Sequence, residues 1–226
     1  PRSHRLARIL GSIVAVCFLG AAVWVSLTVA TLPGLLFSAF GLFQAFALVE
    51  GPFVGALEGF AGLLEVTAGV ASLSLLVHLF LFLPSPRKIL NWPHFGKAVY
   101  GPLPVFLILG VAEVILDPRF YEAFSVATLG WVLAYLILLL WIFGHGWVTA
   151  QPGERWHSGM GIILVGLGIT LAPQLLRLVA FLLLPHVVLP GTEYYSLFAV
   201  AIPISMAIAI RRHQSGPLRG SPSPAS

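Results

Sequence analysis

The sequence has few charged residues and a single cysteine. Of its 226 residues only 9% are charged, whereas 58% are hydrophobic. A water-soluble domain uses about a quarter of its residues as charged groups to solvate its surface. The composition therefore excludes a soluble globular domain and indicates that lipid is the main solvent. Because Cys17 stands alone, the chain has no intrachain disulfide and no cysteine-based metal site.

The common catalytic motifs are also missing from the sequence. It has no His-Glu-x-x-His, no Gly-x-x-x-x-Gly-Lys-Ser/Thr and no Gly-x-Ser-x-Gly, so the residues of the usual zinc, phosphate and serine-hydrolase sites are lacking. We predict no catalytic residue, no metal and no cofactor in this chain. The net charge of +4 does not indicate nucleic acid, since the basic residues flank apolar runs as they do in membrane proteins.

Long apolar runs predict an all-α, polytopic bundle of transmembrane helices. A helix needs about 20 apolar residues to cross a hydrocarbon core of about 30 Å. The runs are apolar on every face, whereas strands of a membrane barrel alternate between polar and apolar residues. Five runs approach or exceed that length, and a shorter sixth ends at Arg211-Arg212; in order they cover 9–32, 60–83, 99–116, 124–143, 159–184 and 194–210.

The number of spans depends on residues 33–59, whose apolar part is only about 15 residues long. We expect six spans, with 33–59 re-entrant or at the outer interface and both termini cytoplasmic. That topology puts every basic residue except Arg119 and Arg177 inside, as the positive-inside rule favours. The alternative is seven spans with the N-terminus outside. Residues 1–8 form a basic cytoplasmic N-terminus, 9–213 the bundle, and 214–226 a Ser/Pro/Gly-rich tail that is expected to be disordered.

Three stretches carry a resemblance to a known family. His78-Leu-Phe-Leu-Phe-Leu-Pro-Ser-Pro-Arg87 resembles the end of one helix in the polytopic sensor regions of ComP-type bacterial histidine kinases. Glu154-Arg155, followed by the glycine-rich run 161–173, resembles a later loop and helix of that region. Residues 189–194 and 202–207 resemble its final helix, so the likeness covers about residues 70 to 213.

The resemblance implies a receptor-like signal-input module in a bacterial cytoplasmic membrane. In that family the last helix leads into a histidine kinase, a PP2C-type phosphatase or a cyclase. This chain has only 13 residues after His213 and no such output domain in them. The expected partners are the lipid bilayer, an extracellular ligand, and a second copy or a separate signalling protein. A small transporter or channel-like protein is the alternative.

A group of intramembrane charges is the predicted ligand site. Glu65, Glu113 and Arg177 lie at a similar depth, roughly 6 to 12 Å below the outer surface, and Glu58 lies two turns above Glu65. A charge at that depth costs about 2.5 to 3.5 kcal/mol on insertion scales, so such residues pair with one another or line a wet cavity. Both alternatives stay open: an interhelical ion pair of Arg177, or an outward-facing polar pocket.

Signal transmission is predicted at the prolines of the last two runs. Pro173 and Pro203 lack the backbone donor and should each kink a helix, with Arg211 and Arg212 carrying the movement to the cytoplasmic side. The glycines of the fifth run superficially resemble a dinucleotide-binding loop, but their spacing differs and no strand precedes them. They are predicted to let neighbouring helices approach closely; they are Gly159, Gly161, Gly166 and Gly168.

Overall fold

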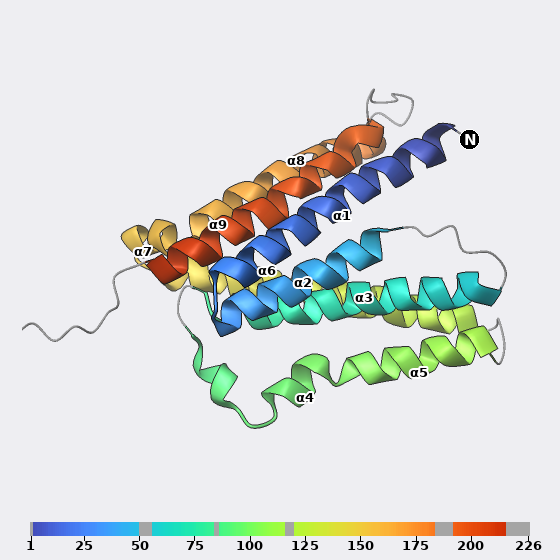
Figure 1. Ribbon diagram of the computed structural model, residues 1–226, viewed down its shortest axis with the longest axis horizontal. Helices are drawn as coiled ribbons and strands as arrows, with labels where there is room; N and C mark the ends of the chain where they lie inside the picture. Colours follow the sequence, from blue (N-terminus) through green and yellow to red (C-terminus); the bar gives the residue numbers. More distant parts are fainter. Residues whose placement is uncertain (1, 50–55, 84–85, 116–119, 184–191, 216–226) are drawn as a thin grey trace, which may run out of the picture.

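The protein is mostly helical over the residues that the computed structural model describes, which are 2–49, 56–83, 86–115, 120–183 and 192–215 (Figure 1). Within these ranges it contains no β-strand, which confirms the predicted all-α class. In chain order the elements are α1 (Arg2–Thr28), α2 (Leu32–Leu48), α3 (Ala56–Phe80), the 3-10 helix η1 (Lys88–Asn91), α4 (Phe95–Tyr100), α5 (Pro102–Ile115), α6 (Phe120–Thr149), α7 (Pro152–His157), α8 (Met160–Leu183), the 3-10 helix η2 (Thr192–Val200) and α9 (Ala201–Ser215).

The long helices alternate in direction along the bundle. Helices α1, α3, α6 and α9 run one way, and α2, α5 and α8 run the other way (Figure 1). The guanidinium carbon of Arg211, near the end of α9, lies 5.4 Å from the ring centroid of Trp24, near the end of α1. Arg8 lies about 24 Å from Trp24 along α1. The start of the chain and the end of α9 are therefore at opposite ends of the bundle.

Among the described residues, four helical segments are long and apolar enough to cross a membrane. They correspond to four of the predicted runs, so length and composition support a membrane protein; the segments are Arg8–Thr28, Gly59–Phe80, Phe95–Ala112 and Val126–Thr149. The fifth predicted run forms α8, whose apolar stretch Met160–Pro173 is shorter. The sixth is divided between η2 and α9. The choice between six and seven spans therefore stays a prediction.

Residues 33–59, predicted to be re-entrant or interfacial, contain the regular helix α2. Pro33 stands in its first turn, where a missing N–H costs nothing because those donors have no partner within the helix. α2 packs against α1 on one side and α3 on the other. A Cβ atom on Gly41 would lie 2.8 Å from the Cβ of Ala22, so only glycine allows the observed approach of α2 to α1. The Ser38 hydroxyl, 3.0 Å from the Ala22 carbonyl, also links the two helices.

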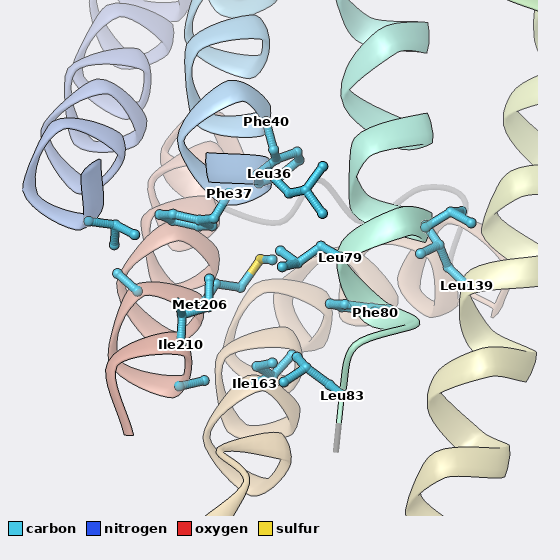
Figure 2. Close-up of a cluster of buried hydrophobic side chains, with 14 of the residues drawn as sticks. Leu36, Phe37, Phe40, Leu79, Phe80, Leu83, Leu139, Ile163, Met206 and Ile210 are labelled. Carbon is cyan, nitrogen blue, oxygen red and sulfur yellow. The ribbon is translucent and has the colours of Figure 1, made fainter. Parts of the chain in front are cut away.

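The main core lies where α1, α2, α3, α6, α8 and α9 meet. Figure 2 shows Phe37 of α2, Leu79 of α3, Ile163 of α8 and Met206 of α9 pointing toward a shared interior, with Leu139 of α6 at its edge. All five side chains are buried. Lipid tails are as apolar as these side chains, so close van der Waals packing, rather than removal from water, holds helices together in a bilayer. A smaller cluster joins α3, α5 and α6; it consists of Leu63, Val70, Phe106 and Phe124.

Small residues bring α8 and α9 together, as the sequence predicts for two of the glycines. Gly159 has a φ of +80°, which a side chain would strain, and a Cβ there would lie 2.6 Å from the Cβ of Ala209. A Cβ on Gly166 would collide with the Ser205 side chain. A Cβ on Gly168 would meet no atom within 4 Å among the described residues, so the packing prediction is wrong for this glycine.

Candidate functional site

The predicted ligand site is distributed over three helices. Glu58 and Glu65 lie on α3, Glu113 on α5 and Arg177 on α8. The Glu65 side chain is half-buried, whereas the side chains of Glu58, Glu113 and Arg177 lie outside the described part of the structure. α8 packs mainly against α9, η2 and α7, while α5 packs mainly against α3, α6 and α4. The ion pair and the pocket both stay predictions.

The two predicted hinge prolines have different surroundings. Pro173 lies inside α8, as expected of a kink-forming residue. Pro203 is the third residue of α9 and is fully buried, so it marks the change from η2 to α9 and does not interrupt a continuous helix. The first turn of a helix has no need of the N–H that proline lacks. Pro203 is therefore located at a helix junction.

Arg211 and Arg212 are both exposed at the end of α9. Arg211 stacks on Trp24, an arrangement that a cation and an indole ring stabilise through the negative face of the ring. A second contact of the same kind places Arg155 of α7 5.2 Å from the ring centroid of Trp147 at the end of α6. Basic groups and tryptophans thus gather at the end of the bundle where α9 finishes.

Polar side chains of α3, α4 and α6 come close together, at positions where the sequence analysis placed no site. The Ser74 hydroxyl of α3 bonds to the Val70 carbonyl of its own helix over 3.4 Å and lies near Tyr135 of α6. The Tyr135 hydroxyl donates to the Val99 carbonyl of α4 over 2.7 Å. That carbonyl stands beside the break between α4 and α5, where Pro102 and Pro104 supply no N–H to the preceding turn. Tyr135 thereby joins α6 to α4.

His78 makes a second polar contact further along the same face of α3. Its Nδ1 atom is 2.8 Å from the hydroxyl of Tyr100 in α4. The imidazole also stacks on Phe82, with ring centroids 5.7 Å apart, and meets Phe95 edge-on at 4.8 Å. A half-buried histidine held by three aromatic rings fixes the position of α4 against the end of α3. Ionisable residues inside a membrane bundle normally mark functional positions.

Three polar atoms in this region have no hydrogen-bond partner among the described residues. They are Thr67 Oγ1 of α3 and Thr128 Oγ1 and Trp131 Nε1 of α6, and all three are shielded from solvent. Other threonines of the bundle bond to a carbonyl of their own helix; Thr28 and Thr149 do so over 2.7 Å. Thr67, Thr128 and Trp131 therefore differ from Thr28 and Thr149 in having no such bond within the described part of the chain.

Arg87 links the segment after α3 to α6 through a hydrogen bond. Its Nη2 atom donates to the Ile142 carbonyl over 2.6 Å. Partial burial lowers the pKa of Arg87 below its ordinary value, yet a guanidinium stays protonated at neutral pH. The positively charged Arg87 guanidinium therefore lies toward the same end of α6 as the contact between Arg155 and Trp147.

The sequence carried a signal for these polar side chains. Thr67, Ser74 and His78 follow a seven- and four-residue spacing, and Thr128 and Tyr135 are seven residues apart, which puts each set on one helical face. Hydroxyl and aromatic residues are frequent in apolar helices, so the pattern pointed to a site only once the two faces were seen to meet. Among the described residues no group of three His, Cys, Asp or Glu side chains could hold a metal ion.

Comparison of the chain with known protein families, with curated proteins and with solved structures finds no match.

Proposed function

We infer that the chain is an integral membrane signal-input module whose output helix is α9. The observation that carries the proposal is the position of α9. One of its faces is buried in the main core through Met206 and Ile210, and its last turn holds Arg211 over Trp24 of α1. A helix that shares a core with α1, α2, α3, α6 and α8 moves when any of them shifts. The resemblance of residues 70 to 213 to ComP-type sensor regions supports the same role.

The proposed topology is the seven-span alternative, with the N-terminus outside and the end of α9 in the cytoplasm. The alternation of helix directions supports it, since it leaves α1 and α9 ending together. α2 has 17 residues, which lies at the lower limit for a span. The exposed basic residues of η1, α4 and α9 then face the cytoplasm, as the positive-inside rule favours. Against the same rule, this topology places Arg8 and its basic neighbours outside.

Single cysteines test this topology. In a Cys17→Ala background, a cysteine at Ser3 is expected to react with a membrane-impermeant maleimide added to intact cells. A cysteine at Ser215 is expected to react only after the membrane is opened. Reaction of both from the same side of the membrane would restore the six-span topology.

The signalling role is tested through the buried face of α9. A chimera that places residues 1–215 before the catalytic part of a bacterial histidine kinase gives a reporter for movement of α9. Met206 is 1% exposed and points toward Leu79 of α3 (Figure 2), whereas Ile208 on the same helix is 39% exposed. Met206→Ala is expected to change kinase output several-fold at equal membrane level, and Ile208→Ala to leave it unchanged.

The transporter alternative predicts the opposite result for this experiment. If Met206→Ala leaves kinase output unaltered while the purified chain conducts solutes in proteoliposomes, the signalling proposal is wrong. The reading frame beyond Ser226 gives an independent check, since a helical hairpin with a phosphoacceptor histidine there would support the receptor role directly.

A further inference from the structure

The segment between α3 and α5 carries a surface that is both basic and apolar. Residues 86–100 form η1, a short turn and α4, and η1 packs against α4. Lys88 and Lys97 are exposed there, and so are Ile89 and Trp92. We call these four residues the η1–α4 surface. Lysines beside a tryptophan and an aliphatic side chain are typical of segments that lie in the headgroup region of a bilayer.

The neighbouring membrane segments place the η1–α4 surface at one end of the bundle. The candidate span in α3 ends at Phe80, and the next one begins at Phe95. α3 and α5 run in opposite directions, so the chain between them turns at one face of the membrane (Figure 1). The six-span and the seven-span topology both put this turn in the cytoplasm. The cytoplasmic leaflet is the one whose anionic lipids give it a negative surface potential.

Contacts on both sides of the turn hold it against the bundle. Arg87 donates to the Ile142 carbonyl of α6 over 2.6 Å. Phe95 is buried, and its ring meets the imidazole of His78 of α3 with centroids 4.8 Å apart. Between these anchors the backbone N–H of Phe95 bonds to the Trp92 carbonyl over 3.0 Å. The two lysines therefore extend from a folded turn, and little ordering is needed before they meet a partner.

The positive charge of this segment is not neutralised along the chain. The sequence has no acidic residue between Glu65 and Glu113, whereas it has three basic ones, Arg87, Lys88 and Lys97. α4 packs against α3 and α5. Glu65 lies about 20 Å along α3 from the end at which α4 packs, and Glu113 lies about 16 Å along α5 from its start. The complementary partner of the η1–α4 surface is therefore negatively charged.

We propose that the η1–α4 surface binds anionic phospholipid at the cytoplasmic face of the membrane. Ile89 and Trp92 enter the boundary between headgroups and acyl chains, and the ammonium groups of Lys88 and Lys97 lie at the level of the phosphates. The apolar stems of the lysines let the charged ends reach that level. The exposed apolar pair favours lipid over an acidic protein, because it lies where the chain passes between two membrane segments. Such binding is expected whether the chain signals or transports.

Quenching of a fluorophore on η1 by labelled lipid tests the proposal. In the Cys17→Ala background, Asn91→Cys adds a thiol at an exposed position and is labelled with nitrobenzoxadiazole. The full chain is reconstituted in phosphatidylcholine vesicles that contain a small fraction of nitroxide-labelled lipid, which is either phosphatidylglycerol or phosphatidylcholine. We expect phosphatidylglycerol to be enriched at the fluorophore by about fivefold or more at equal mole fraction, the factor for one lysine near an anionic surface. High salt should weaken this preference.

Removal of the two lysine charges locates the binding. Lys88 and Lys97 are exposed, so Lys88→Gln/Lys97→Gln leaves the buried contacts of Arg87 and Phe95 in place. We expect this variant to lose most of the preference for phosphatidylglycerol. Arg212→Gln/Arg219→Gln is the matched control, because it removes the same charge from another part of the chain. We expect this control to keep the preference.

Three results would overturn the proposal. Equal quenching by the two lipids means that the surface does not select the anionic headgroup. Absence of quenching by either lipid means that the turn stands away from the bilayer, where an acidic protein could bind it instead. A preference that survives in the lysine variant, or that falls equally in the arginine variant, comes from the net charge of the chain and not from the η1–α4 surface.

Discussion

Tyr135 gives a sharp test of the contact between α6 and α4. The substitution Tyr135→Phe keeps the ring, and with it the contact with Trp131 at 4.2 Å, but removes the hydroxyl that donates to the Val99 carbonyl. This hydrogen bond is lost, and the Val99 carbonyl is left at a helix break. The size of the effect follows from the lost bond and from the carbonyl that it leaves.

A hydrogen bond between membrane helices contributes on average about 0.6 kcal/mol, and a buried polar group left unpaired costs about 1 to 3 kcal/mol. We therefore expect Tyr135→Phe to lower the free energy of unfolding by about 1 to 2 kcal/mol. Unfolding by sodium dodecyl sulfate in mixed micelles, followed by circular dichroism, measures this change.

Tyr194→Phe is the matched control for this prediction. Tyr194 of η2 is 48% exposed, so the same loss of a hydroxyl is expected to change the free energy of unfolding by less than about 0.5 kcal/mol. If Tyr135→Phe and Tyr194→Phe unfold at the same detergent fraction, the Tyr135 hydroxyl does not join α6 to α4 in the way argued above.

Two further predictions concern helix packing and the Arg87 bond. Gly41→Ala is expected to destabilise the bundle by about 1 to 3 kcal/mol, because a Cβ there meets Ala22, whereas Gly20→Ala, with nothing within 4 Å, is expected to be neutral or slightly stabilising in the same assay. Arg87→Met removes a charged donor from the Ile142 carbonyl and is expected to cost about 1 kcal/mol, while Lys88→Met, an exposed neighbour, costs nothing measurable. Equal unfolding of the two members of either pair would contradict the corresponding contact.

The sequence by itself determined the solvent and the class of the protein. A charged fraction of 9% and runs of about 20 apolar residues leave helices in lipid as the only arrangement that satisfies every backbone hydrogen bond without a closed barrel. It also predicted that the glycines of the fifth run serve packing; the close contacts of Gly159 and Gly166 with α9 agree with this prediction, and Gly168 does not. The positions of the charges predicted which loops lie on the same side of the membrane, but they did not decide between six and seven spans.

Only the tertiary structure decided which faces of the helices meet. Hydrophobic periodicity identifies the inner face of a helix in water, but in lipid both faces are apolar and that signal disappears. The sequence therefore could not show that Tyr135 of α6 reaches the Val99 carbonyl of α4, or that His78 of α3 reaches Tyr100 of α4. For the same reason the sequence could not show that α1 and α9 run parallel. Most of each helix is apolar on every face, so its neighbours are determined by the packing of small residues and aromatic rings.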